Sequence, residues 1–224
     1  MAADRTSNYP AEALKLPSVG YVRNLSAEGI LSLKPTLVLG EDDMGPREVV
    51  KQIESVSVQV IRINETHSAV GILEKLTCVA AILGVQEKAD SLIEKRIGDV
   101  ISRLDVAKKK RKTSARVAVV LNFSDGSPII AGRNTSGDGV LAMAGARNVF
   151  SEIKGWKPVS RETLVASSPE HLVITERALK AVGGLVAIKQ DVALSLTPAV
   201  QNGKVHAVDG MALLGFGVRT LDVA

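Results

Sequence analysis

Two short loops in this sequence each combine an aromatic residue with cations. One is GYVR at residues 20–23, and the other is KGWK at residues 154–157. Aromatic rings stack on flat ligands, and cations pair with carboxylates. Trp156 and Lys157, like the aromatic and cation of the first loop, are therefore candidate ligand-binding residues. Together the two loops could grip a planar, anionic ligand.

Tyr21 and Arg23 of the first loop could in addition bind iron. A tyrosine phenolate can coordinate ferric iron, as it does in the haem of catalase, and a nearby guanidinium stabilises the charged phenolate. Haem is planar and anionic, so it meets the requirements of both loops. The spacing alone also fits a plainer interpretation, in which Tyr21 is an amphipathic turn residue and Arg23 is a solvated cation.

The segments that follow the two loops repeat one another. Residues 25–39 (LSAEGILSLKPTLVL) and 159–173 (VSRETLVASSPEHLV) align without a gap. Three pairs of identical residues match, each 134 positions apart: Ser26 and Ser160, Glu28 and Glu162, and Pro35 and Pro169. In each copy the Ser can cap a helix, the Glu complements the helix dipole, and the Pro ends the helix before a strand. Two lobes of one kind are therefore predicted, and a cleft between α/β lobes is a common ligand site.

Strand and helix patterns alternate along the chain. Short aliphatic or β-branched runs bounded by turn residues predict strands at 37–39, 56–63, 115–121, 172–175 and 205–208. Helical periodicity predicts helices at 27–33, 46–54, 68–83, 86–104, 137–144 and 161–167. This alternation predicts an α/β fold built from parallel βαβ units.

The chain is long enough for two small domains. We predict two α/β lobes joined by a long helix, with an N-terminal lobe at 1–84 and a C-terminal lobe at 113–224. The segment 85–112 is predicted to be the bridging helix and a basic connector, because a long amphipathic pattern leads into the run KKKRK at 108–112.

Composition and motifs exclude several classes of protein. Much of the net charge of +4 comes from the basic run, which lacks the interleaved aromatics of a nucleic-acid site. No apolar stretch reaches the roughly 18–20 residues that span a bilayer, so no membrane insertion is expected. The sequence has no phosphate loop, dinucleotide fingerprint or nucleophile elbow, so an enzyme is not predicted. The single Cys78 can form no internal disulfide, and its apolar periodicity predicts a buried core residue.

Four segments carry a family resemblance: VGYVRNLSAEGILSLKPTLVL, AGRNTSGDGVLAMAGARN, GWKPVSRETLVASSPEHLVITERAL and MALLGFGVRT. They resemble the periplasmic haem-binding proteins of bacterial haem ABC importers, which are type III substrate-binding proteins. The resemblance runs nearly from end to end of the chain. It implies two Rossmann-like lobes joined by a rigid helix. It also implies a monomer in the periplasm that holds haem in the cleft between its lobes and delivers it to the importer.

The same resemblance assigns roles to individual residues. It implies that Tyr21 is the axial ligand of the haem iron, and that Arg23 and Arg219 bond the phenolate or pair with the propionates. Some relatives add a His at the segment that aligns with residues 154–157, and this chain has none there, so ligation by Tyr alone is expected. Met211 and Phe216 flank the GFGVR turn, where either a cleft wall or ordinary packing is a reasonable role.

Glu28 and Glu162 occupy equivalent helix starts in the two copies of the repeat. Acids in a first turn complement the helix dipole, and that effect alone could explain both. The resemblance implies a further role, in which each acid docks on arginines of one of the two permease subunits.

Several alternatives remain open at this point. The cargo could instead be a corrinoid or a ferric siderophore, and a less favoured reading is a Rossmann-like enzyme subunit. His67, His171 and His206 show no metal-ligand spacing and are not expected to reach iron. Family members carry a secretion signal and an opening strand and helix ahead of the segment that aligns with residues 2–10, so the first lobe is expected to be truncated.

Overall fold

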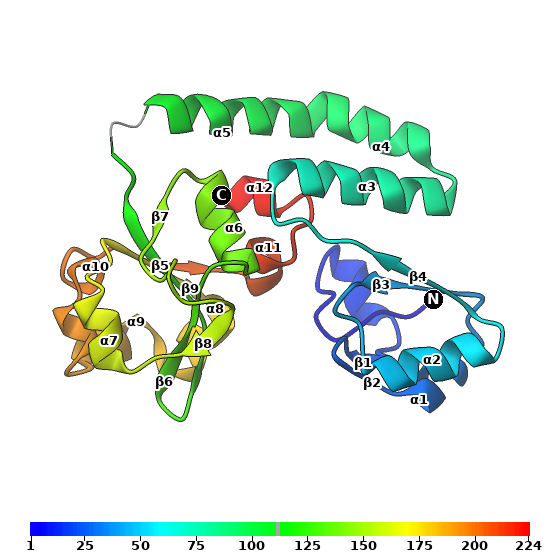
Figure 1. Cartoon of the computed structure of the whole chain (residues 1–224), viewed down its shortest axis with the longest axis horizontal. Coiled ribbons are helices and arrows are strands. Elements are labelled where there is room, and N and C mark those ends of the chain that lie inside the picture. The colour runs from blue at the N-terminus through cyan, green and yellow to red at the C-terminus, as the bar shows by residue number, and fades with distance from the viewer. Residues whose placement is uncertain (111–112) are drawn as a thin grey trace. The chain divides into compact units, whose positions relative to one another are not determined.

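The computed structural model describes the chain at residues 1–110 and 113–224, without the side chains of residues 96 and 110. Residues 111–112, at the end of the predicted basic connector, lie outside the described residues. The described chain divides into two compact units. The first unit comprises residues 1–65 and 81–83, and the second comprises residues 66–80 and 84–224. Figure 1 labels the elements of both units.

The first unit is built on two small sheets. Its elements are η1 (Ala11–Lys15), β1 (Gly20–Tyr21), β2 (Asn24–Leu25), α1 (Ala27–Leu31), β3 (Leu37–Glu41), α2 (Arg47–Ser55) and β4 (Gln59–Ile63). Strands β1 and β2 form an antiparallel hairpin, whereas β3 and β4 pair in parallel. Helix α2 buries Val50 and Ile53, three residues apart on one face, and its polar residues face solvent. These two residues join Leu25, Ile30 and Met44 in the core of the unit.

The second unit contains a mixed sheet of six strands. The strands are β5 (Arg116–Ser124), β6 (Ser127–Ala131), β7 (Arg147–Asn148), β8 (Trp156–Pro158), β9 (His171–Thr175) and β10 (Val205–Val208). The order is β10-β9-β5-β6-β8, with β7 also paired to β5. The pairs β10–β9, β9–β5 and β5–β7 are parallel, as the alternation of strand and helix predicts. The pairs β5–β6 and β6–β8 are antiparallel, which the sequence reasoning did not predict.

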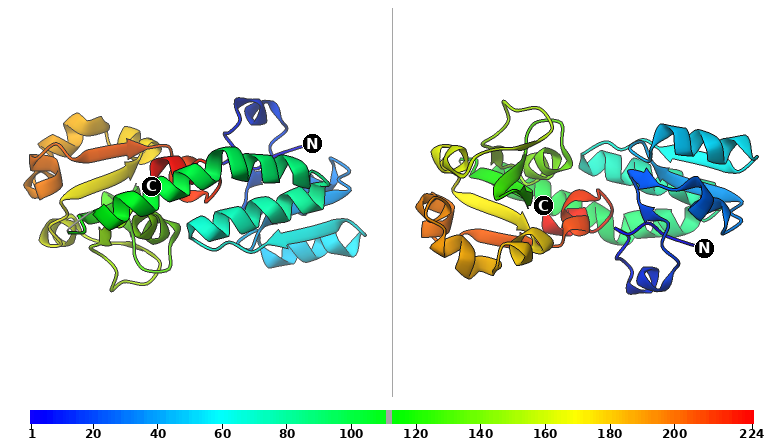
Figure 2. Two further views of the ribbon diagram at one scale, coloured as in Figure 1. Left: turned by 90° about the horizontal axis from the view of Figure 1, so that it is seen from above. Right: turned by 90° about the horizontal axis from the view of Figure 1, so that it is seen from below.

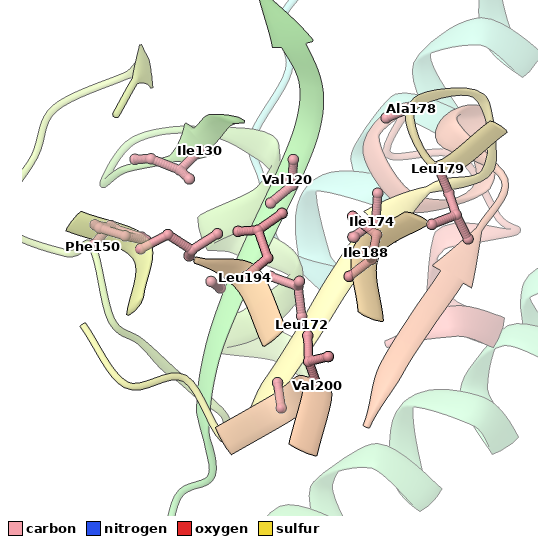
Figure 3. Packing of buried hydrophobic residues seen from close by; sticks show 13 residues of the cluster. Val120, Ile130, Phe150, Leu172, Ile174, Ala178, Leu179, Ile188, Leu194 and Val200 are labelled. Atoms are coloured by element: carbon pink, nitrogen blue, oxygen red, sulfur yellow. The ribbon is translucent and has the colours of Figure 1, made fainter. Parts of the chain in front are cut away.

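Apolar clusters cover both faces of this sheet. Ala118 and Val120 of β5 belong to one cluster, while Val117 and Val119 belong to the other. Successive side chains of a strand point to opposite faces, so an unbroken apolar run marks a strand that is covered on both sides. Figure 3 shows the first cluster, in which Leu172 and Ile174 of β9 pack beside Val120.

Short capped helices connect the strands of the second unit. They are α6 (Ser136–Met143), α7 (Arg161–Ala166), α8 (Glu176–Ala181), α9 (Gly184–Gln190), η3 (Leu194–Leu196), α10 (Pro198–Gln201), α11 (Gly210–Leu214) and α12 (Thr220–Val223). Thr or Asp side chains cap several of them, including Thr135, Thr175, Thr197 and Asp209. The predicted long helix is α4 (Gln86–Leu92), a π-helical turn (Ile93–Ile97) and α5 (Gly98–Lys110), which Figure 2 shows as one continuous rod.

The internal repeat is present in the structure as well as in the sequence. Helices α1 and α7 start 134 positions apart, and strands β3 and β9 match over their whole length at the same offset. Lys34 and Ser168, also equivalent, both have a left-handed backbone, with φ of 48° and 46°. The two units therefore share one helix–turn–strand element, although the turn residues differ in type.

The prediction for Cys78 was wrong. Cys78 is exposed on α3 (Ala69–Leu83), where Ile72, Leu76 and Ala80 pack inward. These three residues are four apart and form one stripe of the helix, whereas Cys78 lies six residues after Ile72 and faces another way. The apolar residues that suggested burial of Cys78 in the sequence lie on two different faces of the helix. None of the helices within the described residues is long and apolar enough to cross a membrane.

Candidate functional site

Tyr21 and Arg23 lie together on the β1–β2 hairpin of the first unit. Tyr21 ends β1 opposite Asn24 of β2, and Arg23 occupies the turn between them. The Nη1 atom of Arg23 donates a hydrogen bond of 2.8 Å to the phenol oxygen of Tyr21. Both side chains come from one tight turn, so the pair is formed by local backbone geometry.

Asp43 completes this group, and the sequence reasoning missed it. The Nε atom of Arg23 donates to Oδ2 of Asp43 at 2.8 Å, and Nη2 lies 2.5 Å from the same oxygen. A signal was available, because Asp43 follows strand β3 of the predicted sheet. Residues just beyond the carboxyl end of a parallel strand are frequent ligand-site residues.

The loop that carries Asp43 is fixed against the hairpin. The Gly45 amide donates to the Val22 carbonyl at 3.0 Å, and the Leu25 amide donates to the Gly45 carbonyl at 2.9 Å. Met44 is buried beside Gly40, where a side-chain carbon would lie only 2.6 Å from the Met44 sulfur. Glycine at position 40 therefore lets Met44 anchor the loop, and Asp43 is held next to Arg23.

Cations surround the ring of Tyr21. The guanidinium carbons of Arg5 and Arg23 lie 5.6 and 5.9 Å from the ring centre. Burial alone would lower the pKa of Arg23, but the charge and hydrogen bond of Asp43, and then those of Tyr21, raise it above its ordinary value. Arg23 is therefore a permanent cation, and its Nη1 atom donates to the phenol oxygen.

In the second unit, the candidate pair Trp156 and Lys157 lies on strand β8. The Trp156 ring is partly buried and packs against the cluster that contains Val119 and Phe216. Lys157 is exposed, as expected for the next residue of a strand. Only part of the Trp156 ring is thus available for stacking, whereas the ammonium of Lys157 faces solvent.

The GFGVR segment has a mixed role in the second unit. Phe216 has no exposed surface, and its ring lies 4.8 Å from that of His67. Of the two roles open for Phe216, this position corresponds to packing. Met211 on α11 is half-buried, and Arg219 forms a 3.2 Å ion pair with Asp209, the cap of α11.

Glu28 and Glu162 are both exposed in the first turn of a helix capped by a Ser side chain. Ser26 accepts from the Gly29 amide at 3.2 Å, and Ser160 accepts from the Thr163 amide at 3.1 Å. A hydrogen bond from its own backbone amide, and then one from the Ser160 side chain, lower the pKa of Glu162. The Glu162 carboxylate is consequently charged at neutral pH.

A substitution of the cap residue tests this description of Glu162. Ser160→Ala removes one of the hydrogen bonds that favour the carboxylate, so the pKa of Glu162 should rise towards its ordinary value. The side-chain carbon signal of Glu162, followed by NMR through an acid titration, measures the change. Ser26→Ala is the matched control in the first unit and should leave the Glu162 titration curve unchanged. An unchanged curve in Ser160→Ala would contradict the assigned cause.

The structure also brings together two histidines that the sequence reasoning kept apart. His171 Nδ1 and His206 Nε2 lie 3.0 Å from each other on the neighbouring strands β9 and β10, and their rings stack. Strand pairing joins these residues, which are 35 positions apart in the sequence. Among the residues that the structure describes, no three His, Cys, Asp or Glu side chains form a metal site.

Comparison with known proteins identifies the family. The chain belongs to the periplasmic binding protein family, whose model matches residues 1–211. This is a family of substrate-binding proteins rather than of enzymes. The two-unit α/β architecture described above agrees with the type III fold that the family resemblance implies.

Several individual proteins are similar to this chain. The chain is similar to the solved structure of the periplasmic haem-binding protein BhuT in complex with two haems, with a TM-score of 0.90 and 34% identity over 99% of this chain and 84% of that one. It is 24% identical to the ABC transporter substrate-binding lipoprotein YvrC of Bacillus subtilis over 96% of this chain and 67% of the relative. It is 26% identical to the vitamin B12-binding protein of Pectobacterium atrosepticum over 78% of this chain. The alignment with that protein spans 63% of its length.

Proposed function

We propose that this protein binds haem, with Tyr21 as the axial ligand of the iron, and delivers it to the permease of an ABC importer. The observation that carries this proposal is the hydrogen bond between Arg23 and the phenol oxygen of Tyr21. A phenol oxygen with a permanent cation beside it is suited to act as a phenolate ligand of ferric iron. The similarity to a haem-binding protein at 34% identity supports haem as the cargo.

The residues present fit haem in two further respects. The Tyr21 ring is flanked by the guanidinium groups of Arg5 and Arg23, which suits an anionic porphyrin. In the second unit, Lys157 and Arg219 supply cations for the propionates, and Trp156 and Met211 supply partly exposed apolar surface. The propionates of haem bound in this way would accept charge-assisted hydrogen bonds from these cations.

Delivery requires recognition by the importer, and we assign that role to Glu28 and Glu162. Both carboxylates are exposed at equivalent places of the internal repeat, one in each unit. Two equivalent anionic positions suit a permease made of two subunits that each present arginines. The protein would act in the periplasm, as its family does, and as a monomer.

Vitamin B12 is the second candidate cargo, because one relative at 26% identity is a vitamin B12-binding protein. Parallel absorption titrations with haemin, cobalamin and a ferric hydroxamate separate the alternatives. Haem binding predicts a saturable change in the Soret band of haemin. The absorption spectra of the other two ligands should show no saturable change. Saturable binding of cobalamin without binding of haemin would overturn the proposal in favour of a corrinoid carrier.

Arg23→Ala and Arg219→Ala should each weaken haem binding without removing the iron ligand. A charge-assisted hydrogen bond contributes about 1.5–3 kcal/mol, which corresponds to roughly 10- to 150-fold in Kd. Haemin titrations of each variant measure the loss. Arg103→Ala, on the exposed face of α5, removes the same charge elsewhere and should bind like the unsubstituted protein. Equal affinity in all three variants would show that neither guanidinium contacts the ligand.

A further inference from the structure

We infer that Asp43 is a positioning residue, which holds the Arg23 guanidinium so that its Nη1 hydrogen points at the oxygen of Tyr21. This inference rests on the proposed function and names a third member of the same site. All three side chains belong to the first unit. Their contacts therefore come from one compact piece of the fold.

Contacts on two sides hold the guanidinium of Arg23. The Nε and Nη2 atoms both contact Oδ2 of Asp43, and Nη1 donates to Tyr21. A guanidinium is planar and its donors point in fixed directions, so contacts on one edge determine where the other edge points. Asp43 thereby sets the direction of the Nη1 donor.

Arg23 needs such a partner because it is otherwise poorly restrained. Its side chain is 59% exposed, and a long exposed arginine has many rotamers available to it. Asp43 is itself restrained by the buried Met44 beside it and by the backbone hydrogen bonds of Gly45 to the hairpin. The loop thus fixes the position of Asp43. Asp43 in turn fixes the guanidinium of Arg23 beside Tyr21.

The negative charge of Asp43 also repels a phenolate at Tyr21. In this respect Asp43 would disfavour iron ligation, whereas its positioning of Arg23 favours it. Its side chain is 41% exposed, and its nearest cation, Arg23, stands between it and Tyr21. Water screens charges at such exposed positions. Loss of the hydrogen-bond geometry should therefore outweigh loss of the repulsion, and removal of Asp43 should weaken haem binding.

A double-mutant cycle on the full chain tests the inference. Asp43→Ala should weaken haemin binding about tenfold, in the range that contacting residues in one network show. The same substitution in an Arg23→Ala background should have no further effect, because Asp43 acts only through Arg23. Asp42→Ala is the matched control, since Asp42 is an exposed acid of the same loop, and it should bind haemin normally. Thermal unfolding of each variant verifies that the fold is retained.

Two outcomes of the cycle would overturn the inference. One is unchanged haemin affinity in Asp43→Ala, and the other is an equal loss with and without Arg23. If the unsubstituted protein binds no haemin, the proposed function fails instead, and a second readout then decides on Asp43. The Nε–H signal of Arg23 in haem-free protein should show increased mobility by NMR in Asp43→Ala but not in Asp42→Ala. Equal mobility in both variants would overturn the positioning role by itself.

Discussion

Tyr21→Phe is expected to abolish the iron–oxygen bond of the haem complex while the fold stays intact. The substitution retains the ring and its volume and deletes only the phenol oxygen. Loss of groups that merely support a metal ligand costs roughly 10- to 100-fold in metal affinity, so loss of the ligand itself should cost at least about 100-fold. The charge-transfer bands of tyrosinate-bound ferric haem should vanish, even if stacking and propionate pairing retain some haem. Absorption spectra and haemin titrations measure both effects.

Tyr9→Phe provides the control for that experiment. Tyr9 is the second tyrosine of the chain, is largely exposed, and belongs to the same unit. Its substitution should leave the ferric spectrum and the affinity unchanged. If instead Tyr21→Phe retains an unaltered ferric spectrum, Tyr21 is not the ligand. The search would then pass to Tyr9 and to the His171–His206 pair.

Reversal of charge at both Glu28 and Glu162 should abolish haem uptake but leave haem binding within about twofold. Like charges brought together at an interface cost several kcal/mol, so two lysines facing permease arginines should prevent productive docking. Both acids are exposed, and neither is among the residues that we propose to bind haem. ATP-dependent haem uptake into vesicles that contain the importer measures delivery, and a haemin titration of the same variant measures binding.

Glu48→Lys with Glu176→Lys is the matched control for the docking variant. These two acids are also exposed in the first turn of a helix, one in each unit, so their reversal has a similar cost against the helix dipole. Uptake should remain normal in this control. Normal uptake in the Glu28/Glu162 variant would show that those acids only complement the helix dipole. Equal loss in both variants would show that any reversed helix end impairs delivery.

The sequence predicted those parts of the fold that depend on local patterns. The repeated Ser, Glu and Pro fixed two capped helices and the strands after them, and α1, α7, β3 and β9 lie where this pattern places them. The pairing of β5 with β6 was missed, although its turn is Asp125-Gly126, both with positive φ. A two-residue Asp-Gly loop between apolar runs is a strong hairpin signal. The β5–β6 hairpin was thus predictable from its Asp-Gly turn, which the sequence reasoning did not use.

The candidate site was predictable only in part, for a physical reason. Tyr21 and Arg23 lie in one turn, so their contact follows from local sequence. Asp43 reaches Arg23 through a loop anchored by Met44 and Gly45, twenty positions later in the chain. His206 likewise meets His171 only because β9 and β10 pair in parallel. Contacts that depend on tertiary packing leave no spacing pattern in one sequence.

The ferric haem complex of the purified protein provides the most direct test of the central claim that Tyr21 ligates haem iron. Electron paramagnetic resonance at one equivalent of haemin reports the spin state, which depends on the axial ligands. A single phenolate ligand, with no histidine in residues 154–157 to add a second bond, predicts a high-spin ferric signal, and Tyr21→Phe should change the shape of this signal because the phenolate is lost. A low-spin signal typical of two nitrogen ligands, unchanged in Tyr21→Phe, would contradict the account.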